Sequence, residues 1–534
     1  MSMRNYNVQL NQNNSRSKIK IGINLATDLV APTLGAKSRR ILIDKEYGDI
    51  DASDDGTTIL NVINPEDTQT GLGVKVVREA SAKTNTDEGD GTTSTAVILR
   101  ELVNKLIKDS SDDDLLFKKD SGSNLKVRKE IRAGIQKVMD YIDQNKIEIT
   151  SREQVEQIGR VSSNSDEIGV MLADMFDKIG KNGNVSTVEG NSINTTYEII
   201  SGMSFNQGWI APQFVTDPER EEAVLEPKTS DYVNVLVTSK KIADIKDIEK
   251  ISELFNAGNN DMLIISEGIE GVPLQSLIIN KMRQLIRVIA VKSPRAGNND
   301  MLEDVCAVVG ATLVGGPEVK FEDLKPEHLG KAKRVVVTKD KTIIVGTGLY
   351  KERVDERLAI LTSKLEREKS EYEKKLIQDR IAKLTGGVGS IYVGGATAME
   401  IKDKKSKIID AVSAVKSALN GGVVAGGGVA LLNASSVLSD KIEGENILKK
   451  AIEKPFYQIL ENADLVLKDN LSPNEGYDAE TGEKCDMINA GIIDPANVVK
   501  ASVRNAVSSA LMIANLGGAI TLVREKEDKE DKEE

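Results

Sequence analysis

The chain has 534 residues, of which 40% are hydrophobic, 29% charged and only 3% aromatic. A chain of this length is too long to fold around a single hydrophobic core, so we expect roughly two to four domains with aliphatic cores. A net charge of −12 leaves no basic excess to neutralise phosphates, which disfavours nucleic acid as a partner.

Histidine and cysteine are too scarce for several kinds of site. The chain has one histidine, His328, in a polar stretch where we expect a solvated surface residue, and two distant cysteines, Cys306 and Cys485. Zinc sites, disulfide frameworks and Ser/His or Cys/His nucleophiles are therefore disfavoured. Any chemistry must depend on carboxylates, hydroxyls, backbone amides and a divalent metal.

No apolar run approaches the roughly 20 residues that span a bilayer. Residues 1–20 lack the apolar core of a secretory signal, so we predict a short arm or edge strand there. We expect a cytoplasmic protein with no membrane partner.

The first 145 residues are predicted to be mostly helical. Helical spacing of apolar residues occurs in 21–34, 74–84 and 127–142, whereas 41–44 and 59–62 are predicted strands around a turn at 53–56. The acidic segment 108–123 is predicted to be a surface loop.

The most informative segment is residues 89–95, GDGTTST, which precede an apolar helical run. Glycines let backbone amides approach an anion, a helix N-terminus favours negative charge, and an aspartate can hold Mg²⁺. The segment is not a Walker A loop, since the chain contains no GxxxxGK[ST]. The residues alone leave two interpretations open, a triphosphate site or an ordinary turn with a helix cap.

From about residue 185 to 345, short β-rich pieces alternate with helical segments, which predicts a separate α/β domain. Residues 353–384 are predicted to form a helical hairpin. A strand is predicted at 390–393, followed by a helix that carries Asp410. From the glycines at 426–428 to about residue 519, the sequence is again predicted to be mainly helical. The charged tail 524–534 is predicted to be disordered. Both chain ends would thus build one helical domain, with the α/β body inserted between them.

Six motifs occur in the order found in one known family. They are 33–35 (TLG), 55–56 (DG), 89–95 (GDGTTST), 162–167 (SSNSDE), 426–431 (GGGVAL) and 476–495 (GYDAETGE…DM…GIIDP). With residues 382–388, they make the chain resemble a group I chaperonin, the bacterial and organellar class, over nearly its full length.

The resemblance implies a multidomain α/β fold. A mainly helical equatorial ATPase domain would comprise residues 1–145 and 421–534, and a small intermediate hinge domain 146–201 and 389–420. An α/β apical domain, 202–388, would bind clients. Glycines at the hinges would be Gly202, Gly387 and Gly422.

The resemblance also implies a nucleotide site that uses ATP and Mg²⁺, with K⁺ as a further candidate. Asp90 would hold Mg²⁺, and Asp55 and Asp410 would orient or deprotonate the attacking water. The other nucleotide contacts would be Thr33, Leu34, Gly35, Ala36, Asp54, Gly91, Thr92, Thr93, Ser94, Gly427, Asp478, Ala479, Glu480 and Asp494.

Two of these positions depart from the family's pattern. Ala36 replaces a proline, and Asp54 replaces a lysine that is common in bacterial members. An acid at 54 removes a positive charge near the triphosphate, which could change ATP affinity or turnover; it could equally be a turn-capping acid in Ser-Asp-Asp-Gly.

An apolar groove in the apical domain would bind unfolded chains or a small co-chaperonin. The matching positions are Trp209, Phe214, Leu274, Ile278 and Ile279, although the same spacing fits ordinary core residues. The neighbouring helix carries Glu249 and Ser252 where the family has leucine, so the groove is expected to be more polar than usual.

We therefore predict an ATP-driven protein-folding chaperonin that assembles as a ring homo-oligomer, with a double heptamer as the expected form. The sequence leaves two alternatives open. One is a phosphotransferase-like ATPase that uses residues 89–95 as its phosphate loop, and the other is a non-hydrolysing ring scaffold. Retention of Asp55, Asp90 and Asp410 argues against the scaffold.

Overall fold

The computed structural model describes most of the chain, in two compact units. The described residues are 6–9, 12–44, 50–107, 125–181, 183–190, 192–200, 202–218, 221–228, 231–256, 261–294, 299–316, 319–368, 370–467, 471–516 and 519–522. The first unit comprises residues 1–173 and 397–534, and the second 174–396. The predicted loop 108–123 and tail 524–534 lie outside the described residues.

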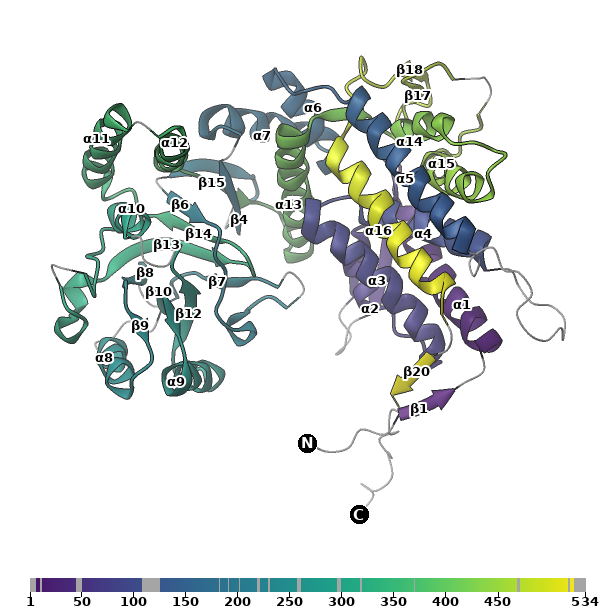
Figure 1. The fold of residues 1–534 in the computed structure, drawn as a ribbon. Helices are drawn as coiled ribbons and strands as arrows, with labels where there is room; N and C mark the ends of the chain where they lie inside the picture. Colours follow the sequence, from purple (N-terminus) through teal and green to yellow (C-terminus); the bar gives the residue numbers. More distant parts are fainter. Residues whose placement is uncertain are drawn as a thin grey trace. The chain divides into compact units, whose positions relative to one another are not determined.

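The first unit is mainly helical and uses both ends of the chain. Among its helices, α3, α4 and α16 are long and pack side by side in Figure 1. The helices are α1 (Gln12–Val30), α2 (Gly56–Val62), α3 (Thr68–Glu88), α4 (Thr92–Leu106), α5 (Leu125–Asn145), α6 (Arg152–Ser163), α13 (Ala398–Gly421), α14 (Val429–Ala434), α15 (Glu443–Asn462) and α16 (Ala496–Ala514). Its strands are β1 (Tyr6–Gln9), β2 (Ile41–Asp44), β3 (Ile50–Ser53), β16 (Val423–Ala425), β17 (Glu475–Tyr477), β18 (Lys484–Asp486), β19 (Ile493–Pro495) and β20 (Ala519–Leu522). Helix α7 (Asp166–Ile179) crosses the boundary between the units.

Helix α4 is the central helix of this unit. It packs against α3, α15 and α16, so segments far apart in sequence share one core. Val97, Ile98, Leu99 and Leu102 are all fully buried. Burial of each such aliphatic side chain contributes roughly 1.5–3 kcal/mol, which makes α4 a rigid base for the loop that precedes it.

The two chain ends meet in a small sheet. Strand β1 pairs antiparallel with β20, with Tyr6 opposite Leu522, so part of the arm or edge strand predicted over residues 1–20 is a strand. Residues 12–20 of that segment instead belong to α1. The predicted strand at 59–62 is wrong, because these residues belong to α2. Asp55 caps α2 by accepting from the backbone amides of Thr57 and Thr58, and this cap outweighs the strand propensity of the short apolar run.

The second unit is built around a seven-stranded mixed sheet. The strands follow the order β12-β10-β8-β13-β14-β6, and β7 also pairs with β13. A three-stranded sheet, β4-β15-β5, lies in the same unit. The strands are β4 (Asn184–Glu189), β5 (Thr196–Ile200), β6 (Gly202–Phe205), β7 (Ala223–Leu225), β8 (Val233–Val237), β9 (Lys241–Ile242), β10 (Asp261–Ser266), β11 (Gly268–Ile269), β12 (Arg287–Lys292), β13 (Gly330–Val337), β14 (Thr342–Gly346) and β15 (Val388–Val393).

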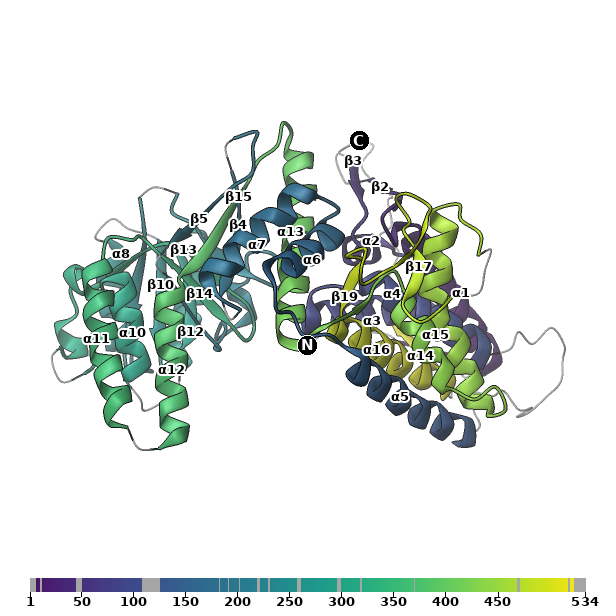
Figure 2. The same cartoon turned by 90° about the horizontal axis from the view of Figure 1, so that it is seen from above.

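The helices of this unit alternate with strands, as the sequence predicts. They are α8 (Ile245–Asn256), α9 (Gly271–Met282), α10 (Asp300–Val309), α11 (Lys351–Arg367) and α12 (Glu371–Gly386). Helices α11 and α12 lie side by side in Figure 2, which confirms the predicted helical hairpin. His328 is only partly solvated, since its side chain is 16% exposed and its Nδ1 accepts from the Lys325 amide.

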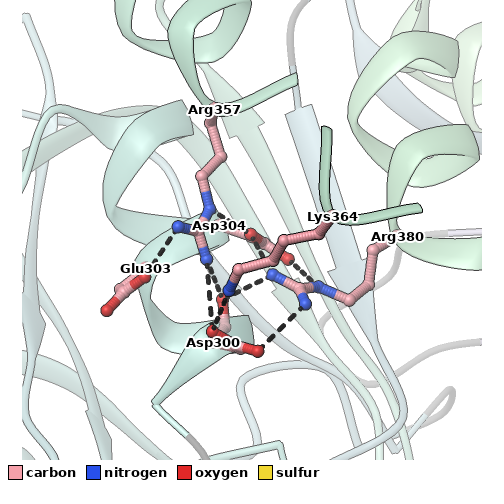
Figure 3. Close-up of polar contacts among 6 residues, drawn as sticks. All are labelled: Asp300, Glu303, Asp304, Arg357, Lys364 and Arg380. Atoms are coloured by element: carbon pink, nitrogen blue, oxygen red, sulfur yellow. Dashed lines mark hydrogen bonds and ion pairs between the residues drawn. The ribbon is translucent and has the colours of Figure 1, made fainter. Parts of the chain in front are cut away.

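A buried charge cluster ties α10 to the helical hairpin (Figure 3). The Asp304 carboxylate is fully buried and accepts from Arg357 Nε at 2.7 Å and from Arg380 Nε at 2.6 Å. Asp300 contacts both guanidinium groups at the edge of the cluster. Asp304 is thus the fully buried carboxylate that the two arginines share, whereas the carboxylates of Asp300 and Glu303 are partly exposed.

We expect Asp304→Asn to destabilise the packing of α10 against α11 and α12 by about 3 kcal/mol, because it leaves two buried guanidinium groups undercompensated. The destabilisation is measured as faster hydrogen exchange of the backbone amides of α10 and α12. The matched control is Glu303→Gln. Glu303 binds the same Arg357 at 2.7 Å but is 46% exposed, so its loss should cost less than about 1 kcal/mol. Equal effects of the two variants would contradict the prediction.

Candidate nucleotide site

The first unit contains a cavity of about 600 Å³. Residues from both halves of this unit line it, including every position expected to contact nucleotide: Thr33, Leu34, Gly35, Ala36, Asp54, Asp55, Asp90, Gly91, Thr92, Thr93, Ser94, Asp410, Gly427, Asp478, Ala479, Glu480 and Asp494. These residues are up to 461 positions apart in sequence (Thr33 to Asp494), and the fold brings them to one place. Their individual roles stay predictions.

One wall of the cavity is the N-terminus of α4. Gly91 precedes the helix with φ +82°, so the first amides of a 15-residue helix face the cavity without intrahelical partners. A Cβ on Gly91 would lie 2.6 Å from Ser502 Oγ and 2.8 Å from Val498 Cγ1, which leaves room only for glycine. The loop therefore has the geometry of an anion cradle and also serves as a helix cap.

The loop before β2 lies beside this cradle. Thr33 Oγ1 is 3.4 Å from Thr93 Oγ1, so hydroxyls from two segments converge. Asn462 of α15 holds the loop by donating to the carbonyls of Ala31 and Leu34, both at 2.8 Å. Gly35, with φ +93°, completes the turn.

Two carboxylates lie deep in the cavity. Asp90 accepts from the Gly91 amide and, at 3.5 Å, from Ser162 Oγ; burial raises its pKa. Asp494 accepts from the Gly427 amide, and burial together with the Asp90 charge raises its pKa to about 7. Both groups are thus desolvated acids near one another, which a cation would stabilise in the ionised form.

This donor set fits Mg²⁺. The described residues contain no cluster of three or more His, Cys, Asp or Glu side chains that could hold a metal alone. Magnesium, however, usually takes one or two carboxylates and completes its shell with phosphate oxygens and water. Asp90 beside an anion cradle meets that requirement, with Asp494 close by.

The two predicted water-orienting acids come from opposite parts of the chain. Asp55 caps α2, and its carboxylate accepts from the amides of Thr57 and Thr58 and from Thr58 Oγ1 at 2.6 Å. These bonds fix its orientation. Asp410 lies on α13, which belongs to the same compact unit, and lines the same cavity half-buried.

Asp54 forms an ion pair that the sequence did not predict. Lys407 Nζ on α13 lies 3.2 Å from Asp54 Oδ2 and 3.4 Å from Asp403 Oδ2. Both Asp54 and Lys407 line the cavity. A lysine is therefore present beside position 54 although the residue at 54 is an acid.

The remaining wall is formed by glycines and a short hairpin. Gly427, with φ +63°, and Gly428, with φ +78°, directly precede α14. Because neither has a side chain, their backbone atoms line the cavity. Asp478, Ala479 and Glu480 follow β17, where the Glu480 amide donates to Asp478 Oδ1 at 2.9 Å.

Sequence reasoning missed several polar residues of the cavity, among them one arginine, one serine and one lysine. Arg160 and Ser162 lie on α6 and Lys407 on α13, and all three line it. Ser162 opens the SSNSDE motif, so its position could have been inferred from the motif. Arg160 and Lys407 follow no local pattern that would have distinguished them from solvated helix residues.

The predicted client-groove residues differ in exposure. Ile279 is 48% exposed, whereas Trp209, Leu274 and Ile278 are half-buried against the core of the second unit. Phe214 is fully buried and lies behind that surface. On the neighbouring helix α8, the apolar residues Ile248, Ile251 and Phe255 are also buried.

The predicted hinge glycines occupy restricted backbone positions. Gly387 has φ +64° and Gly422 has φ +78°, conformations that favour glycine. Gly202 is buried, and a Cβ there would lie 2.5 Å from Val388 Cγ2.

Comparison with known proteins assigns the family. The model of the TCP-1/cpn60 chaperonin family matches residues 26–516. The chain belongs to this family. The resemblance stated from the motifs is thereby confirmed.

Two solved structures share the fold, both of the chaperonin gp146 from the bacteriophage EL 2 (Pseudomonas aeruginosa) in the presence of ATP-BeFx. Each is 19% identical to this chain, and the match covers 96% of this chain and 98% of the phage protein, with TM-scores of 0.65 and 0.60. This chaperonin is thus a divergent family member with a multidomain α/β fold. No helix among its described residues is long and apolar enough to cross a membrane.

We expect Asp494→Asn to stabilise the protein without nucleotide, because it removes a buried charge beside Asp90. The unfolded chain loses this proton near pH 3.8, whereas the folded protein keeps it to about pH 7. The advantage of the variant should therefore grow between these pH values, reach about 2–4 kcal/mol, and stay level above pH 7. Thermal unfolding at several pH values in EDTA measures it, and a difference independent of pH would contradict the prediction.

Proposed function

We propose that this chaperonin binds Mg·ATP in the cavity of the first unit and hydrolyses it to drive the folding of non-native proteins. The observation that carries the proposal is the convergence of all the predicted nucleotide residues on one cavity. The α4 N-terminus and its glycines suit phosphates, and the short hairpin after β17 suits the base.

Each acid has a distinct proposed role. Asp90 would hold Mg²⁺, which neutralises charge on the phosphates when it is bound. Asp55, fixed by its bonds to the α2 N-terminus, and Asp410 would position the attacking water and accept its proton. Thr92, Thr93 and Ser94 would donate to phosphate oxygens through amides and hydroxyls. K⁺ is a further proposed cation.

We also propose a three-domain arrangement. In that arrangement, residues 146–201 and 389–420 form a hinge domain that moves about Gly202, Gly387 and Gly422. The protein would assemble as a ring, with a double heptamer as the proposed form, and act in the cytoplasm with or without a co-chaperonin.

We expect Asp410→Ala to lower Mg-dependent ATP turnover at least about 100-fold while ATP binding changes less than about threefold, because the acid acts on water rather than on the bound nucleotide. A phosphate-release assay and calorimetry measure the two effects. Wild-type protein without Mg-dependent turnover would favour the ring scaffold. Transfer of phosphate to a small-molecule acceptor would favour the phosphotransferase.

The proposed client surface lies on α9. Val272, Ile279 and Met282 are 53%, 48% and 72% exposed, and their spacing places them along one face of the helix. Exposed apolar side chains in a row are suited to unfolded chains, which expose apolar side chains of their own.

We expect Met282→Glu to weaken binding of a denatured client about tenfold, because a charge would have to be desolvated against the client. Suppression of client aggregation at graded chaperonin concentrations measures it. The control is Leu349→Glu, an equally drastic change at a residue that is 64% exposed and lies between β14 and α11. Equal loss in both variants, or loss in neither, would argue against α9 as the client surface.

A further inference from the structure

The cavity has too few cations for the ligand proposed to bind in it. Its lining includes eight carboxylates, Asp54, Asp55, Asp90, Asp166, Asp410, Asp478, Glu480 and Asp494, and two basic side chains, Arg160 and Lys407. A bound triphosphate would add several negative charges. One Mg²⁺ offsets only two of these charges, which leaves the basic side chains of the lining as the chain's own charged groups able to offset more.

The two basic residues are placed differently. Arg160 has a side chain 45% exposed, and among the described residues its ion pair is with Asp166 at 3.9 Å, so it lies where solvent weakens its charge. Lys407 is 24% exposed and lies between Asp54 and Asp403. It is one helical turn from Asp410 on α13, and its partner Asp54 immediately precedes Asp55. Lys407 thus lies where the segments of both candidate catalytic acids meet.

From this placement we propose that Lys407 binds the γ-phosphate of ATP, exchanging Asp54 for the phosphate when the nucleotide enters. The inference rests on the proposed ATPase function. A lysine on a flexible stem can change partners without moving its helix, and a phosphate dianion is a stronger partner than a single carboxylate. Lys407 contacts two carboxylates, Asp54 at 3.2 Å and Asp403 at 3.4 Å, so it keeps Asp403 as a partner when it leaves Asp54.

Two neighbouring ion pairs hold the same segments together when Lys407 leaves Asp54. Lys402 Nζ lies 3.1 Å from Asp51 Oδ2, and Arg40 Nη2 lies 2.8 Å from Asp403 Oδ2. Neither Lys402 nor Arg40 lines the cavity. They connect α13 to the β2–β3 region without facing the nucleotide, which makes Lys402 a matched control.

The test compares affinities for Mg·ADP and for a non-hydrolysable Mg·ATP analogue, by calorimetry on the assembled protein. We expect Lys407→Met to weaken the ATP analogue about tenfold and ADP less than about twofold, since only the γ-phosphate contact is lost. Lys407→Arg should keep most of the discrimination. Asp54→Asn should strengthen binding of the ATP analogue, because Lys407 no longer has to leave a carboxylate.

Several outcomes would overturn the inference. Lys402→Met must leave both affinities near wild type; if it matches Lys407→Met, the lysines merely hold α13 in place. Loss of discrimination in Arg160→Met but not in Lys407→Met would assign the contact to Arg160. Equal weakening of both nucleotides by Lys407→Met would also refute it. Wild-type protein that binds neither nucleotide would instead refute the proposed function, before any variant is compared.

Discussion

Repulsion between carboxylates is the constraint on which the first unit depends. Asp90 and Asp494 are desolvated close to one another, and burial raises the pKa of both. Such an arrangement is unfavourable by itself, and proteins retain it where a ligand relieves it. The surrounding helices must therefore hold these acids in place at a cost in stability, and the buried aliphatic faces of α4 and α16 supply the necessary rigidity.

The way the chain is folded lets a cation or nucleotide affect distant segments at once. Asp90 follows α3, Asp494 lies on β19 and Asp410 on α13, so one cavity joins the two ends of the chain with a helix close to the insertion point of the second unit. A ligand that binds these acids differently in two states would shift the balance between them. No further transmitting element is needed within the first unit, because α13 itself carries Asp410.

Much of the fold and of the site follows from local sequence. Gly89 and Gly91 adopt positive φ because a tight turn joins two helices. Their pattern predicted a turn before a helix, and by itself it left a triphosphate site and an ordinary helix cap open as alternatives. The prediction of a strand at 59–62 was wrong because the β-propensity of these residues takes no account of the helix cap that Asp55 forms. The sequence also did not predict which apolar side chains are exposed. Phe214 is fully buried, whereas Ile279 is 48% exposed. Which face of a segment is covered depends on tertiary packing, which spacing does not encode.

Asp54 shows that the charge near a residue depends on its neighbours in space as well as on its neighbours in the sequence. Considered alone, an acid at this position removes a cation from the triphosphate's surroundings. In the structure, Lys407, 353 residues away in the chain, occupies the space beside it, so the position has an acid and a base within 3.2 Å. The electrostatic field acting on a ligand depends on the summed charges and their distances, not on which segment carries them. Lys407 therefore offsets the charge of Asp54 within the cavity, and the effect of an acid at position 54 depends on this distant lysine as well as on its own segment.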